Sequence, residues 1–154
     1  MGLKKTEKLV KEYLYDFAYD GGATGNIALK CVDPTGDLLE EGLIVQDVMI
    51  VNEGALTSTG SPTITVGTVT DPDGFFVDVV AKVTNLGTVV RAGEVDGALV
   101  WDSTADAKKG YPVPAAANDK TLRMVIGTAP LSGGKLRIIV EGVKPGTLAH
   151  PSAV

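Results

Sequence analysis

Apolar and polar residues alternate along many short segments of the chain, and the most regular case lies near its start. Tyr13, Tyr15, Phe17 and Tyr19 occupy every second position. A period of two is typical of a strand with one buried face. We therefore predict a strand over residues 13–19, with a less regular helical spacing as the alternative.

Further alternating segments predict a series of short strands separated by turns. The expected strands cover residues 26–32, 42–54, 62–69, 87–92, 97–103, 120–127 and 135–142. Asp-Pro sequences in 33–37 and 70–74 indicate tight turns. Residues 128–134 are expected to close a hairpin between the last two strands. Residues 102–118 form a long predicted loop, because prolines exclude a central strand there.

One segment departs from the period of two. Apolar residues between Phe76 and Val83 follow helical spacing. Asp73 is suited to the start of a helix and Gly87 to its end. The pattern predicts one short helix at about residues 74–86.

Many short strands with turn signals between them indicate the fold class. We expect an all-β protein with an antiparallel β-sandwich, jelly-roll-like, and an extended N-terminal arm. The 154 residues, with 19 glycines and 8 prolines, suit a single sandwich domain. We predict a basic N-terminal arm over residues 1–12, the β-sandwich domain over 13–142 and a C-terminal tail over 143–154.

Charge and cysteine content limit the classes of partner. The net charge of −5 argues against nucleic acid as a partner bound by general attraction. No apolar stretch approaches the length of a membrane span, so no membrane partner is expected. A single cysteine, Cys31, allows no internal disulfide and fits assembly in a reducing cytosol.

The sequence offers no catalytic group, cofactor site or metal site. Its only histidine, His150, lies four residues from the end, where no partner holds it in fixed geometry. Cys31 alternates with Ile27 and Leu29, so we predict that it is a small buried apolar side chain. The acidic turns, with Asp33 and Asp37 in one and Asp71 and Asp73 in the other, do not approach the six or more oxygens of a calcium loop, because no downstream bidentate Glu has the right spacing. Each is interpreted first as a turn. We expect no enzyme and no cofactor.

Several segments together resemble one protein family. They are the opening "YDFAYDGG" at 15–22, "IAL" at 27–29, "LIVQDVMIV" at 43–51, "TITVGTVTDPDG" at 63–74 and "LSGGKLRIIVEG" at 131–142. In this order they resemble the head decoration proteins, or cement proteins, of tailed bacteriophages. The resemblance covers residues 13–142, although none of the segments carries chemistry.

The resemblance implies a structural protein of the virion. Such a protein sits on the capsid exterior, commonly as a homotrimer, binds the major capsid protein and stabilises the head by bridging capsid subunits. It would be assembled in the host cytoplasm. The alternative is a small β-sandwich module on a virion tail or surface that binds a receptor or carbohydrate.

Two groups of residues are candidates for contact with a shell. The lysines of the arm are Lys4, Lys5, Lys8 and Lys11, and the aromatic residues are Tyr13, Tyr15, Phe17 and Tyr19. The lysines could meet acidic patches on a capsid, or could only solubilise the arm. The aromatic face could pack on a neighbour, or could only cover the protein's own sandwich.

Overall fold

The protein is described by a computed structural model that covers residues 5–33, 36–95, 97, 99–102 and 107–146. Its elements in chain order are β1 (Glu7–Asp16), α1 (Phe17–Asp20), β2 (Gly25–Ala28), β3 (Lys30–Cys31), β4 (Ile44–Thr57), β5 (Thr63–Thr68), α2 (Val80–Val83), β6 (Val89–Arg91), the 3-10 helix η1 (Ala92–Glu94), β7 (Trp101–Asp102), β8 (Ala107–Lys108), β9 (Tyr111–Pro112), α3 (Ala117–Lys120), β10 (Leu122–Gly127) and β11 (Gly133–Lys144).

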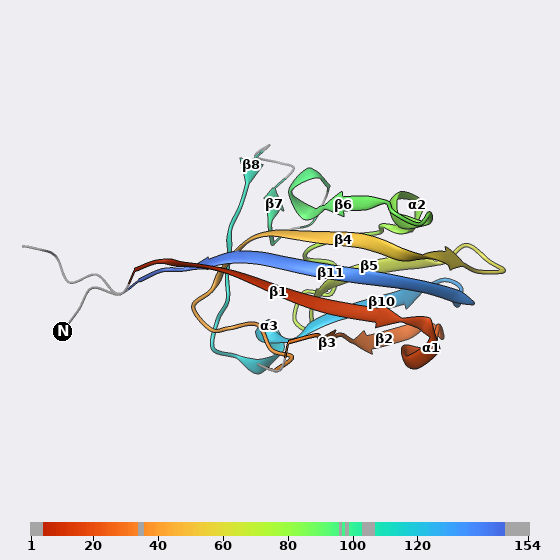
Figure 1. Cartoon of the computed structure of the whole chain (residues 1–154), viewed down its shortest axis with the longest axis horizontal. Coiled ribbons are helices and arrows are strands. Elements are labelled where there is room, and N and C mark those ends of the chain that lie inside the picture. Colours follow the sequence, from red (N-terminus) through yellow and green to blue (C-terminus); the bar gives the residue numbers. More distant parts are fainter. Residues whose placement is uncertain (1–4, 34–35, 96, 98, 103–106, 147–154) are drawn as a thin grey trace, which may run out of the picture.

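Two antiparallel sheets form the body of the molecule (Figure 1). The larger sheet is six-stranded in the order β3-β1-β11-β4-β6, and β9 also pairs with β4. The smaller sheet is three-stranded in the order β2-β10-β5, and β7 pairs separately with β8. The all-β sandwich class is therefore confirmed.

The hydrophobic core lies between these two sheets. Ile50 and Ile138 of the larger sheet and Ile64 and Met124 of the smaller sheet are all fully buried in one cluster. Each comes from the apolar set of an alternating strand, since successive side chains of a strand point to opposite faces. The predicted strands 42–54 and 62–69 are confirmed as β4 and β5.

The predicted strand 13–19 is correct only as far as Asp16. There the Asp16 carboxylate accepts a hydrogen bond from Ala18 N at 3.0 Å, which caps the short helix α1. Gly21 ends that helix with a φ of 73° and donates its N–H to Phe17 O. The aromatic alternation therefore does not continue on one face beyond Tyr15.

The predicted strand 26–32 divides between the two sheets. Its first part is β2 of the smaller sheet, and its second part is β3, which pairs with β1 of the larger sheet. Leu29 lies between the two, is buried, and donates its N–H to Leu122 O at 3.2 Å. A local apolar pattern carries no signal for this change of sheet.

The hairpin predicted around residues 128–134 is wrong. β10 pairs with β2 and β5, whereas β11 pairs with β1 and β4, so the two strands lie in different sheets. The connection crosses from one sheet to the other. Thr128 has a φ of 68° at the start of the crossing.

The predicted helix at 74–86 is limited to the single turn α2. Phe75 and Phe76 precede it as fully buried residues, and Phe76 forms an isolated bridge with Val66. The carboxylate of Asp78, and not that of Asp73, accepts the N–H of Val80. The N–H groups of Phe75 and Phe76 both donate to Val66 O of β5, so these backbone groups are bound to the sheet and not to a helical turn where the spacing predicted helix.

Four further predicted bounds differ from the structure. The predicted strand 97–103 is reduced to β7, and the predicted loop 102–118 contains β8, β9 and the start of α3. β1 begins at Glu7 and pairs continuously with β11, from Glu7 opposite Lys144 to Asp16 opposite Lys135. The boundary predicted at residue 12 thus falls inside a strand, and the one predicted at residue 143 falls inside its partner.

Candidate interaction surfaces

The four aromatic residues near the start of the chain lie in different environments. Tyr13 and Tyr15 have no exposed surface, and both pack in the core. Phe17 is half-buried against the core, and Tyr19 is 88% exposed. Among these aromatic side chains, the structure leaves only Tyr19 freely accessible to a partner.

The two buried tyrosines, both in the second half of β1, hold two different loops. The Tyr13 hydroxyl donates to Asp37 O at 3.0 Å, and the Tyr15 hydroxyl donates to Gly21 O at 2.8 Å. Burial raises the pKa of Tyr15 to about 12, and it raises the pKa of Tyr13 further. Both phenols therefore stay protonated as hydrogen-bond donors at neutral pH.

Three of the four lysines predicted as shell contacts lie in the described residues, and their surroundings differ. Lys5 and Lys8 are exposed, whereas the half-buried Lys11 donates its Nζ to Leu38 O at 2.5 Å. Lys4 lies outside the described residues. Glu7 and Glu12 lie on the same strand, so this segment presents both signs of charge.

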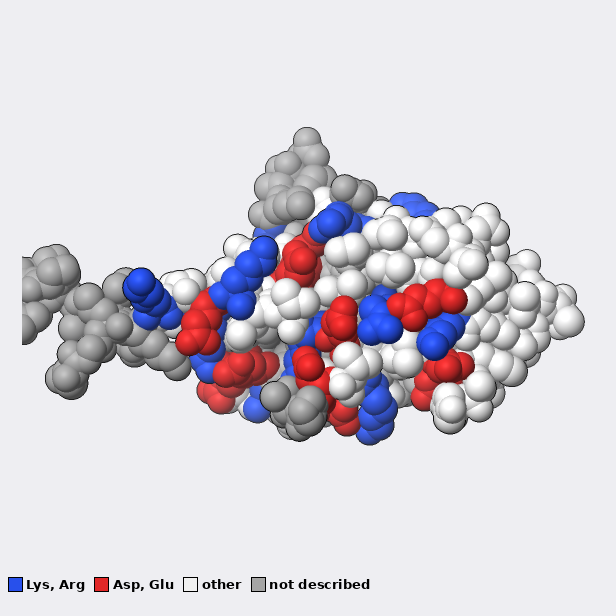
Figure 2. Space-filling model, viewed as in Figure 1, with Lys and Arg blue, Asp and Glu red and all other residues white. Residues whose placement is uncertain are grey.

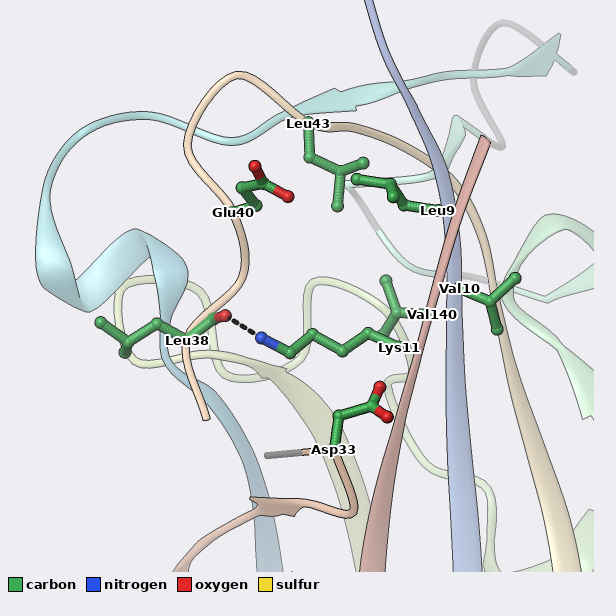
Figure 3. Close-up of a pocket in the computed structure, with 8 residues that line it drawn as sticks. All are labelled: Leu9, Val10, Lys11, Asp33, Leu38, Glu40, Leu43 and Val140. Atoms are coloured by element: carbon green, nitrogen blue, oxygen red, sulfur yellow. Dashed lines mark hydrogen bonds between the residues drawn. The ribbon is translucent and has the colours of Figure 1, made fainter. Parts of the chain in front are cut away.

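A groove lies beside the first half of β1 (Figure 3), and no pattern in the sequence predicted it. Its volume is ≈ 630 Å³. The lining residues are Leu9, Val10, Lys11, Asp33, Leu38, Glu40, Leu43 and Val140. Apolar side chains from β1 and β11 face a loop that carries carboxylates, so the groove has an apolar floor and a charged rim.

Asp37 holds this loop against the sheet. Its carboxylate accepts hydrogen bonds from Cys31 N at 2.9 Å and Lys30 Nζ at 3.2 Å. These bonds, that from Cys31 first, lower the pKa of Asp37. The described residues contain no group of three or more side chains able to hold a metal ion.

The outer face of the larger sheet carries charges of alternating sign (Figure 2). The guanidinium of Arg137, on β11, pairs with Glu53 of β4 and Glu12 of β1. Arg91 pairs with Asp47 at 2.9 Å. Because Arg137 and Arg91 both have carboxylate partners in their own chain, this face offers a surface of mixed charge.

The opposite end of the molecule has loops without charged residues. Residues 54–70 and 124–134 contain no Asp, Glu, Lys or Arg, and Figure 2 shows a white surface at this end. Ser58 Oγ donates to Pro130 O at 2.6 Å, and Ser132 N donates to Thr57 O at 2.7 Å. We call this region the uncharged end, and the region of Lys5–Lys11 and residues 36–43 the charged end.

No protein-family model and no curated protein sequence matches the chain. Two solved structures match its fold. A chain of the cyanophage Pam1 capsid asymmetric unit has a TM-score of 0.62 and 15% identity, over 92% of this chain and 87% of that chain. A chain of the acid-stable capsid of Helicobacter pylori bacteriophage KHP30 has a TM-score of 0.56 and 15% identity. This match covers 95% of this chain and 99% of that chain.

These two structural similarities concern the fold alone. At this identity they show that the antiparallel sandwich of the chain also occurs in chains of two phage capsids. The described part of the chain contains no helix long and apolar enough to cross a membrane.

Proposed function

We propose that this protein is a structural component of a phage virion that binds the outside of the head and bridges capsid subunits. The observation that carries the proposal is the near full-length match of the fold, in both directions, to chains of two phage capsids. The resemblance of residues 13–142 to head decoration proteins agrees with it. Fold alone does not fix function, so the decorating role needs its own test.

Attachment of this kind needs no chemistry at a single site. Many copies that each bury a modest surface hold a shell together through multivalency. The major capsid protein is the proposed partner, and the protein is proposed to act as a homotrimer, without enzymatic activity. The accessible lysines Lys5 and Lys8, together with Tyr19, are the proposed contact residues that remain exposed in the isolated chain.

The test uses heads assembled without this chain. Purified protein is added to them, and the bound copies are counted after sedimentation. We expect saturable binding and a higher temperature of head disruption. Failure of the folded protein to bind such heads would overturn the decorating role, and binding to a glycan array instead would favour the receptor- or carbohydrate-binding module.

The contribution of the lysines is tested by charge reversal. The double variant Lys5→Glu and Lys8→Glu should bind heads more weakly, and the difference should shrink as salt is raised. Lys82→Glu is the matched control, because Lys82 is an exposed lysine on α2, outside the charged end. Equal binding by the double variant and the control would assign the lysines to solubility alone.

A further inference from the structure

Among the residues that the structure describes, no strand pairs with one edge of β1 over its first half. On one side, β11 pairs with the whole of β1. On the other side, β3 pairs only with Tyr13 and Leu14, and Val32 N donates to Glu12 O at 2.9 Å. Within the described residues, no strand pairs with Glu7–Lys11 on that side. An open strand edge is a template for another strand.

The direction of the free backbone groups follows from the pairing of Glu12. Successive residues of a strand direct their N–H and C=O to opposite sides, so alternate residues share a side. Since Glu12 O faces the β3 side, the N–H and C=O of Val10 and Lys8 face it too. Val10 is 51% exposed and Lys8 is exposed. The register of β1 with β11 is uninterrupted here, so no bulge turns this edge away.

We propose that this edge binds the same edge of a second copy of the chain, antiparallel, about a two-fold axis at Leu9. Lys8 of each copy then lies opposite Val10 of the other, and the two exchange both backbone hydrogen bonds. Glu7 of each copy lies opposite Lys11 of the other. Opposite charges in directly facing positions stabilise a strand pair.

The charges and the free backbone groups select this register over its neighbours. Pairing centred on Lys8 would set Lys8 against Lys8, and like charges directly opposite destabilise a pair. Pairing centred on Val10 would require Glu12 to bond with Lys8 of the second copy. The carbonyl of Glu12 already accepts from Val32 N. Of these three registers, only the one centred on Leu9 uses the free backbone groups of both Lys8 and Val10 and sets Glu7 opposite Lys11.

Side chains of the groove also favour a second copy as the occupant. Leu9 is partly buried and lines the groove with Leu43 and Val140 (Figure 3). In the proposed pair, Leu9 of one copy faces Leu9 of the other on this apolar side. Lys11 bonds Leu38 O through one of three ammonium donors, so it can also reach a carboxylate. The contact is isologous, as a two-fold interface requires, so it would join copies of different trimers and is distinct from the heterologous contact within a homotrimer.

The pairing does not depend on the decorating role, and it is tested with the full chain in solution. In a Cys31→Ser background, Leu9→Cys places two thiols at a facing, non-hydrogen-bonded pair, where the Cα separation of about 4.5 Å permits a disulfide. Val10→Cys is the matched control. In the proposed register Val10 faces Lys8 of the second copy, so the two Val10 residues are diagonal neighbours about 7–8 Å apart. That separation is too long for a disulfide.

Under mild oxidation we expect covalent dimers from the Leu9→Cys protein and several-fold fewer from the Val10→Cys protein, measured on non-reducing gels. Circular dichroism verifies that both variants are folded. Equal yields from the two variants, or no dimer from folded Leu9→Cys protein, would overturn the proposal.

The register is tested by charge reversal in the Leu9→Cys protein. Glu7→Lys and Lys11→Glu should each lower the dimer yield, because each sets like charges opposite one another. A mixture of the two variants should restore it, since every facing pair is then of opposite sign. The mixture carries the same changes within each chain, so restored yield reports the contact between chains. Yields that the reversals leave unchanged, or that mixing does not restore, would contradict this register.

Discussion

The charged end and the uncharged end are built on the same three long strands, β1, β4 and β11, yet different forces hold them. At the uncharged end, loops bond to each other through backbone and hydroxyl groups, as in the bonds of Ser58 to Pro130 and of Leu131 N to Gly22 O at 2.8 Å. At the charged end, ionised side chains hold the loop, with Asp37 bonded to Lys30 and Lys144 paired with Glu40.

This difference indicates which end of the molecule responds to changes in pH and salt concentration. Hydrogen bonds between neutral groups do not titrate, whereas ion pairs weaken with salt and with protonation. The uncharged end is a closed set of loops, and the charged end has an open strand edge beside a groove. We therefore expect the uncharged end to resist pH and salt, and the charged end to carry contacts that depend on both.

The largest expected effect comes from a glycine at the uncharged end. A Cβ on Gly22 would lie 2.2 Å from Leu131 O, so Gly22→Ala must displace the crossing between the sheets. Overpacking of this kind costs about 1–3 kcal/mol of unfolding free energy, and we expect the upper part of that range. Urea unfolding measures it.

Gly42→Ala is the comparison at the charged end. Gly42 has a φ of 82°, and its Cβ would meet no atom within 4 Å. Only backbone strain remains, at about 1–2 kcal/mol. If Gly42→Ala cost as much as Gly22→Ala, the tight closure of the uncharged end would be contradicted.

A smaller loss of stability is expected when the hydroxyl of Tyr13 or that of Tyr15 is removed, and each loss should affect a different loop. Tyr13→Phe removes the bond to Asp37 O, and Tyr15→Phe removes the bond to Gly21 O. Each should cost about 1 kcal/mol, the net worth of a typical hydrogen bond. Hydrogen exchange should show faster opening near residue 37 in the first variant and near residue 21 in the second. Equal changes at both loops in either variant would show that the ends are coupled.

The smallest effect is a pH dependence confined to the charged end. The folded pKa of Asp37 is lowered, from an ordinary value of 3.8, by the bonds from Cys31 N and Lys30. The stability that these bonds contribute is present above pH 3.8 and is lost as the pH falls through the lower folded value. Asp37→Asn should remove this part of the acid dependence in thermal melts. The same acid slope in the variant would place the titrating group elsewhere.

Local patterns predicted the fold class and several strands. β4 and β5 were found because an alternation of apolar residues depends only on the segment itself. The turn at Asp16–Gly21 could have been found as well, since an Asp before a short helix and a Gly after it are local signals. The strand was nevertheless predicted to continue to residue 19, because Phe17 and Tyr19 extend the alternation of aromatic residues.

Long-range pairing decided the rest. Residues 128–134 have the composition of a hairpin turn, but the choice between a hairpin and a crossing depends on which strands β10 and β11 meet, far away in the sequence. The sequence by itself determined that Tyr13 and Tyr15 share one face of β1, because a strand's side chains alternate, and the tertiary structure decided that this face packs in the protein's own core. Only the tertiary structure decided that the pairing of β3 with β1 ends at Tyr13. Within the described residues this leaves Lys8 and Val10 without a strand partner on that edge. The physical reason is that backbone hydrogen bonds between strands join segments far apart in the sequence, and a local pattern does not specify them.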